Sequence, residues 1–191
     1  MKKKGLALVL ALTLLVVGVV AGTLAWLTAK SDTVTNTFTT SDITVKLEET
    51  KGTPVTSGKE FKMIPGYTIS KDPTATVLDG SEECYLFVKL DESTNFKNYM
   101  TYEMDEGWTV VPGKTNVYFR KVLTANIGKP YSVLKGDQVT VKGTVTKEMM
   151  ETAEQDKPTL KITAYASQLY KNATTEFPVA EAWANVNPTT P

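Results

Sequence analysis

The sequence contains no histidine and only one cysteine among its 191 residues. Without an imidazole, Ser-His-Asp or Cys-His catalysis and histidine-ligated zinc sites are excluded. One thiol can neither form an internal disulfide nor supply a cluster of soft metal ligands. An enzyme of this composition would have to use carboxylates, Lys or Tyr alone. We therefore expect no enzymatic activity, no metal site and no cofactor.

Positive charge is also scarce outside the N-terminus. The formal net charge is +0, with 21 basic and 21 acidic residues, and Arg120 is the single arginine. Lys2, Lys3 and Lys4 lie in the first 25 residues, which contain no acid, so the remaining 166 residues are weakly acidic. That body is long enough for one domain with a substantial core. It has no basic field for binding phosphates, and we do not expect nucleic-acid binding.

The first 25 residues have the organisation of a secretory signal peptide. A basic start (1–4) precedes an apolar stretch (5–20), and small residues then surround a cleavage site between Ala25 and Trp26. The alternative is an uncleaved membrane anchor, because the uncharged run 5–29 exceeds the roughly 20 residues that span a bilayer. We expect contact with the membrane only through this segment while it is uncleaved.

After the signal, apolar residues alternate with polar ones in the period-two pattern of half-buried strands. The run Cys84–Leu90 is apolar on both faces and predicts a central strand in which Cys84 is buried. We predict an all-β fold, an antiparallel two-sheet, jelly-roll-like sandwich over 41–186 with one or two short helices. Further strands are expected at 43–48, 75–78, 99–104, 108–111, 117–123, 139–146 and 160–169.

Two segments break the strand pattern. Residues 146–155 predict a helix with Thr146 as its N-cap, and 179–185 predict a short helix after Pro178. The Pro- and Thr-rich end 187–191 predicts a disordered tail.

The arm that follows the signal, residues 26–40, is Thr-rich and lacks Pro and Gly. It could be the first strand of its own sheet, or it could leave its domain and complete the sheet of a neighbour. For a lone arm, the free energy gained from burying its few apolar side chains and forming ladder hydrogen bonds is nearly cancelled by the entropy cost of ordering its residues. An acceptor would therefore have to be apolar and preformed. The candidate donor strand comprises Thr33, Val34, Thr35, Asn36, Thr37 and Phe38.

A resemblance is carried by several short motifs. The signal ending 22–28 and the strand 43–47 resemble exported proteins processed by the SipW-type signal peptidase, the TasA/camelysin-like family of biofilm-matrix fibre subunits. Segments 63–66, 80–89 and 162–168 are similar to the central and closing strands of such proteins.

This resemblance implies a jelly-roll domain that is secreted after cleavage by that peptidase. It also implies self-assembly into a head-to-tail homopolymer by donor-strand exchange of the mature N-terminus. The location would be the extracellular matrix or cell surface of a Gram-positive bacterium. The strands Cys84–Leu90 and Leu160–Leu169 would build the accepting core. The metallo-endopeptidase label of camelysin relatives is not transferred, because the chain has no histidine.

An alternative is a monomeric adhesin or surface-binding module that uses exposed aromatic side chains. Core packing of the same rings is the competing interpretation, and we favour it. The rings in question are Tyr99, Tyr102, Trp108 and Tyr118.

Overall fold

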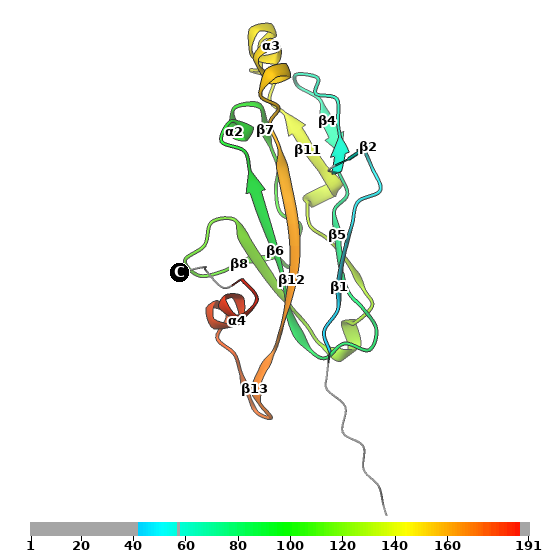
Figure 1. Ribbon diagram of the computed structural model, residues 1–191, viewed down its shortest axis with the longest axis vertical. Coiled ribbons are helices and arrows are strands. Elements are labelled where there is room, and N and C mark those ends of the chain that lie inside the picture. Colours follow the sequence, from blue (N-terminus) through cyan, green and yellow to red (C-terminus); the bar gives the residue numbers. More distant parts are fainter. Residues whose placement is uncertain (1–41, 57, 188–191) are drawn as a thin grey trace, which may run out of the picture. The chain divides into compact units, whose positions relative to one another are not determined.

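One long strand, β6 (Cys84–Glu92), forms the centre of the domain in a computed structural model that describes residues 42–56 and 58–187. It pairs antiparallel with β12 (Leu160–Gln168) along all nine residues, and on its other side with β9 (Val117–Val122). β8 (Thr109–Val110) adds to β9, so the sheet has the order β12-β6-β9-β8. Figure 1 shows β12 running beside β6. The predicted central strand is confirmed.

The predicted signal peptide, the arm that follows it and the end of the predicted tail lie outside the described residues. The predicted cleavage site at Ala25 and Trp26 and the predicted donor strand Thr33–Phe38 therefore lie outside them too.

A second layer of strands faces this sheet. It consists of two three-stranded antiparallel sheets with the orders β1-β5-β10 and β4-β11-β7. Their strands are β1 (Val45–Glu48), β5 (Thr74–Val77), β10 (Pro130–Ser132), β4 (Thr68–Ser70), β11 (Gln138–Val141) and β7 (Met100–Thr101). The predicted all-β antiparallel sandwich is confirmed.

Two hairpins and two 3-10 turns complete the strand regions. The hairpins pair β2 (Thr53–Val55) with β3 (Gly58–Glu60), and β13 (Tyr170–Asn172) with β14 (Thr175–Glu176). The turns are Thr124–Asn126 and Lys135–Asp137.

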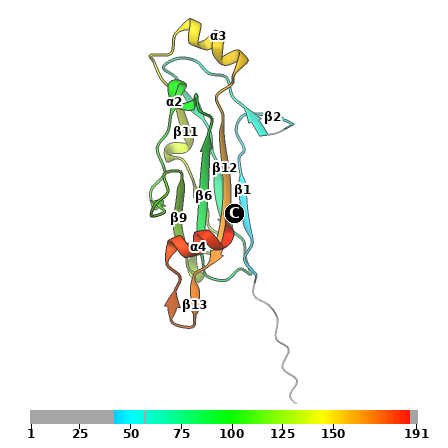
Figure 2. The same cartoon turned by 60° about the vertical axis from the view of Figure 1, so that its left-hand side comes forward.

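The four-stranded sheet is covered on both faces, and this explains the apolar run of β6. Leu86, Val88 and Leu90 point into the main core between the layers. Tyr85 and Phe87 point the other way, into a second cluster closed by α4 (Val179–Val186), which lies across the outer face of the sheet (Figure 2). In that cluster the ring of Trp183 lies 5.3 Å from Phe87 and, edge-on, 5.2 Å from Tyr165.

Both predicted helices are present. α3 (Lys147–Gln155) begins at Thr146, whose side chain accepts a hydrogen bond from the N–H of Met149 at 3.3 Å. A third helix, the single turn α2 (Phe96–Tyr99), was not predicted, because four residues are too few for a periodic signal. No helix in the described ranges is both long and apolar enough to span a membrane.

The predicted strand over 139–146 is too long. β11 ends at Val141, and the N–H of Val145 bonds the carbonyl of Lys142 at 3.2 Å, so the chain turns before α3. Val145 is nevertheless buried, as Val139 and Val141 are. The period-two spacing of these three valines therefore indicates which side chains are buried, and it does not show that the strand continues.

Candidate functional site

The free edge of β12 is the longest regular strand edge in the described structure. β12 has nine residues, and its register with β6 runs from Leu160 to Gln168 without a bulge. Among the residues described, β6 is its only strand partner. The opposite edge of the same sheet, β8, has two residues.

The hydrogen bonds that flank β12 show which backbone groups point outward. The N–H of Ser93 bonds Thr159 at 2.9 Å, and the N–H of Leu169 bonds Glu83 at 3.1 Å. Hydrogen-bonded pairs alternate in an antiparallel ladder, so odd-numbered residues of β12 bond to β6. The N–H and C=O groups of Ile162, Ala164 and Ala166 therefore point away from β6, toward the free edge.

The side chains of these three residues face the main core, yet they are only partly buried. Ala164 and Ala166 are also small, so the core is thinly covered along this edge. A strand added here would find unpaired backbone groups and an apolar surface at the same positions.

β1 runs beside β12 on this side of the domain (Figure 2). The N–H of Leu78 bonds the carbonyl of Thr44, so Val45 and Leu47 turn their backbone groups away from β5. Cα atoms of β1 and β12 come within 8 Å of one another without any ladder between the two strands. A strand bonded to both would need about 9.5 Å, twice the usual strand spacing. An added strand can therefore bond to only one of them in this conformation, and β12 offers the longer edge.

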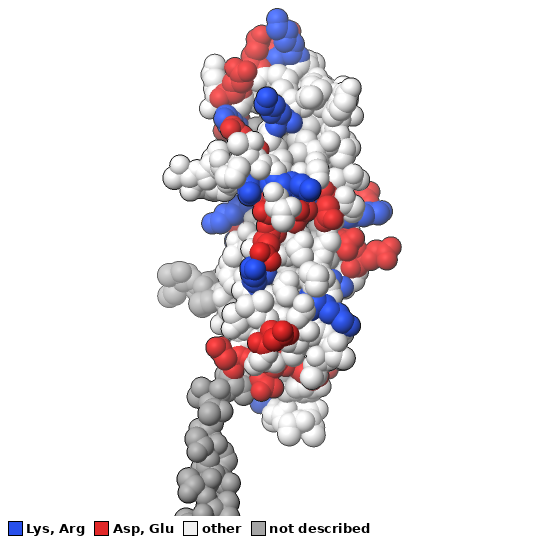
Figure 3. Space-filling view, turned by 90° about the vertical axis from the view of Figure 1, so that its right-hand side faces the viewer, with Lys and Arg blue, Asp and Glu red and all other residues white. Residues whose placement is uncertain are grey.

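The edge of β12 lacks the features that normally prevent strand addition. Its sequence LKITAYASQ contains no proline and one charged residue, Lys161. Proteins usually protect edge strands with lysines, prolines, bulges or shortness. Figure 3 shows basic and acidic side chains interspersed on the face that carries β1 and β2, with no large area of one sign.

The β8 edge, in contrast, is closed by side chains. The Arg120 guanidinium lies 3.9 Å from the ring centre of Tyr131 and 5.1 Å from that of Trp108. The indole N–H of Trp108 donates to the carbonyl of Ser132 at 2.7 Å, which connects this edge to β10 in the facing layer. Burial lowers the pKa of Arg120, the expected response of a cation removed from water.

Comparison with protein families, characterised proteins and solved structures finds no match. The function must therefore be argued from the residues alone. No group of three or more acidic or cysteine side chains in the described part of the chain is placed to hold a metal ion. Cys84 is fully buried, as predicted, and burial raises the pKa of its thiol to about 11.

The four aromatic residues considered for an adhesin divide into two pairs. Tyr99 is buried and its hydroxyl donates to the carbonyl of Met149 at 3.0 Å, while Trp108 belongs to the closed β8 edge. Tyr102 and Tyr118 are partly exposed and line a cleft. Core packing is thus confirmed for Tyr99. Trp108, Tyr102 and Tyr118 also pack against the main core, and each of them stays partly exposed.

Sequence reasoning named Leu160–Leu169 as an accepting strand but missed that its outer edge is free. Period two identifies a strand and its faces, but it does not say which neighbours that strand has.

Proposed function

We propose that this protein is a secreted structural subunit of an extracellular fibre. In this proposal the N-terminal arm of one copy adds as a strand to the β12 edge of the next copy. The observation that carries the proposal is the long, regular and unprotected edge of β12, where unpaired backbone and thinly covered core coincide. The sequence resemblance to biofilm-matrix fibre subunits and the signal-like N-terminus support secretion.

The point where the arm joins the domain gives the added strand a direction. Asp42 accepts a hydrogen bond from the N–H of Glu82, beside Cys84, and Cys84 pairs with Gln168. The described part of the chain therefore begins, at Asp42, near the Gln168 end of β12. In a head-to-tail fibre, the arm of the next subunit reaches β12 from the Leu160 end. Such an arm runs antiparallel to β12 and extends the antiparallel sheet.

The composition of the arm fits this edge. When it is extended, Val34, Asn36 and Phe38 fall on one face, and the threonines at 33, 35 and 37 fall on the other. With the first of these faces inward, Val34 and Phe38 would cover the core next to the small side chains of Ala164 and Ala166. Each buried apolar side chain contributes about 1.5–3 kcal/mol, against about 1–2 kcal/mol for ordering each arm residue. A preformed apolar edge is what lets such an arm bind.

Electron microscopy of two purified chains tests the proposal. One chain starts at Trp26, the predicted mature N-terminus, and the other starts at Asp42. We expect fibres from the first and monomers from the second. A synthetic peptide of residues 26–41 should also slow fibre growth, because it occupies the β12 edge. Fibres from the chain that starts at Asp42, or monomers from both chains after several days, would contradict the proposal.

A further inference from the structure

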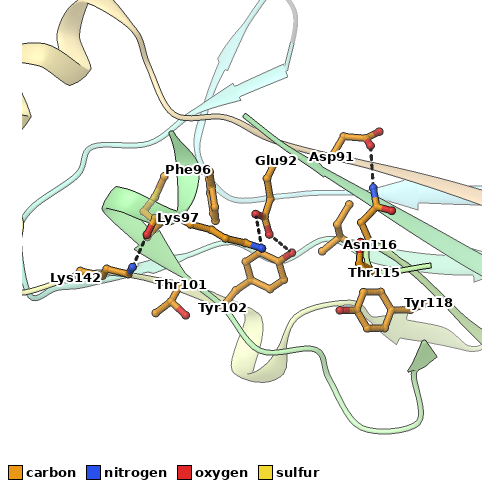
Figure 4. A pocket seen from close by; sticks show the side chains of 12 residues that line it. Asp91, Glu92, Phe96, Lys97, Thr101, Tyr102, Thr115, Asn116, Tyr118 and Lys142 are labelled. Atoms are coloured by element: carbon orange, nitrogen blue, oxygen red, sulfur yellow. Dashed lines mark hydrogen bonds and ion pairs between the residues drawn. The ribbon is translucent and has the colours of Figure 1, made fainter. Parts of the chain in front are cut away.

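A cleft of about 630 Å³ opens on the side of β6 that lies away from β12. Its residues come from the end of β6, the start of β9, the turn α2, β7 and the residues that follow β7 (Figure 4). The volume is within the range of small-molecule sites, roughly 300–1,000 Å³. The cleft lies entirely within the described domain, so its role does not depend on fibre assembly.

The cleft combines an apolar base with aromatic walls. Leu90 and Phe96 are buried at its base. Tyr102 and Tyr118 are partly exposed, and the Tyr102 ring lies 5.9 Å from Phe96. Aromatic rings with polar ends contribute large apolar faces and can also form hydrogen bonds.

Polar side chains converge on one carboxylate. Glu92 accepts a hydrogen bond from the hydroxyl of Tyr102 at 2.7 Å and forms an ion pair with Lys97 at 3.4 Å. The Glu92 side chain is 19% exposed and that of Lys97 is 80% exposed, so the carboxylate is held in place while its cationic partner is mostly solvated. Burial, and then Glu92, raise the pKa of Tyr102, so this hydroxyl remains a donor.

A second carboxylate is arranged in the same way. Asp91 accepts from the side-chain amide of Asn116 at 3.2 Å and pairs with Lys89 at 3.0 Å. Lys142 lines the far side and donates to the backbone carbonyl of Lys97. Among the lining residues, two acids are thus balanced by two lysines.

This balance selects against ionic ligands. A cationic ligand would have to displace Lys97 from Glu92, or Lys89, which lies outside the lining, from Asp91. An anionic ligand would have to approach two carboxylates. A neutral ligand rich in hydroxyl groups meets neither cost, because it can donate to the free lone pairs of the carboxylates and accept from ammonium groups.

We propose that this cleft binds a neutral saccharide. The rings of Tyr102 and Tyr118 would contact the C–H faces of the sugar. Glu92, Asn116 and the hydroxyls of Thr101 and Thr115 would bond its hydroxyl groups. This pattern of apolar walls with a few fixed polar groups is the usual construction of a small-molecule site. The protein would then be a fibre subunit that also binds glycan.

Binding of the chain from Trp26 to an array of neutral oligosaccharides tests this inference. The array should include glucans, galactans and N-acetylglucosamine oligomers, with uronic-acid oligomers and free lysine as charged probes. We expect at least one neutral oligosaccharide to bind more tightly than about 1 mM. Titration calorimetry then compares variants, and Glu92→Gln and Tyr118→Ala should each weaken binding by about tenfold.

Tyr67→Ala is the matched control, because Tyr67 is 65% exposed and lies outside the cleft. Its affinity should equal that of the parent chain. Asn116→Ala is a smaller change at the rim of the cleft. It takes the place of Glu92→Gln or Tyr118→Ala if either of these variants shows no thermal unfolding transition. No binding of any neutral oligosaccharide, stronger binding of the charged probes, or equal affinities across all variants would overturn the inference. The fibre proposal would be unaffected by each of these results, because it depends on β12.

Discussion

The two edges of the four-stranded sheet differ in almost every respect. β12 is nine residues long, regular and flanked by a thinly covered core. β8 is two residues long and is covered by Arg120 between Trp108 and Tyr131. Both edges belong to the same four-stranded sheet. Exposure of β12 is therefore specific to that edge, since the opposite edge is protected.

The domain also offers two different kinds of binding surface, one made of backbone groups and one made of side chains. At β12 the open groups are backbone N–H and C=O in a row, which another strand can satisfy. At the end of β6, between α2, β7 and the residues that lead into β9, the open groups are side chains around a cleft, and these suit a small ligand. The kind of unpaired group at each border determines the kind of partner that fits it.

The largest effect is expected from Ala164→Pro. The N–H of Ala164 points outward, so proline removes a donor from the free edge and leaves the ladder with β6 intact. Fibre formation by the chain from Trp26 should be lost, while the free energy of unfolding falls by no more than about 1–2 kcal/mol. Electron microscopy and urea unfolding measure the two quantities.

Ala164→Ser is the control for this change, because it keeps the backbone N–H and should still form fibres. If the folded Ala164→Pro chain assembled as fast as the parent, β12 would not be the acceptor, and the contrast between the two edges would lose its functional meaning.

Amide hydrogen exchange should reveal the alternation along β12 directly. In the chain that starts at Asp42, we expect the N–H groups of Ile162, Ala164 and Ala166 to exchange about 100-fold faster than those of Thr163 and Tyr165, which bond to β6. In fibres of the chain from Trp26, the fast set should become protected. Uniform protection along β12 in the monomer would show that some other segment already covers this edge.

The smallest effect is expected at the protected edge. Arg120→Ala removes the guanidinium from between two rings and should lower the free energy of unfolding by about 1–2 kcal/mol, as judged by urea unfolding. Lys114→Ala, an exposed neighbour, should change it by less than about 0.5 kcal/mol. Fibre growth of the folded Arg120→Ala chain should match the parent. A loss of growth would mean that the β8 edge also takes part in assembly.

Much of the fold followed from local pattern. The apolar run of β6 identified the central strand, and Thr146 identified the start of α3. The features that were missed depend on neighbours distant in the sequence. The end of β11 at Val141 reflects a turn into α3, and the cleft joins β6 to β7 and β9. The alternation of polar and apolar residues within one segment does not indicate which distant segments it will contact.

Only part of the candidate site could be predicted from the sequence. The composition of Leu160–Leu169 predicted a core strand, and Thr33–Phe38 predicted a strand with few apolar residues of its own. That the former has a free edge depends on strand order, which was observed in the structure.

The helix α4 has a consequence for the order in which the domain can be completed. A chain is synthesised from its N-terminus, so β6 leaves the ribosome about ninety residues before Trp183. Until α4 follows, Phe87 and Tyr165 have no cover on the outer face of the sheet. Phe87 therefore lacks this cover for a little under half of the synthesis, and the aromatic surface that it forms with Tyr165 closes only when α4 packs against the sheet.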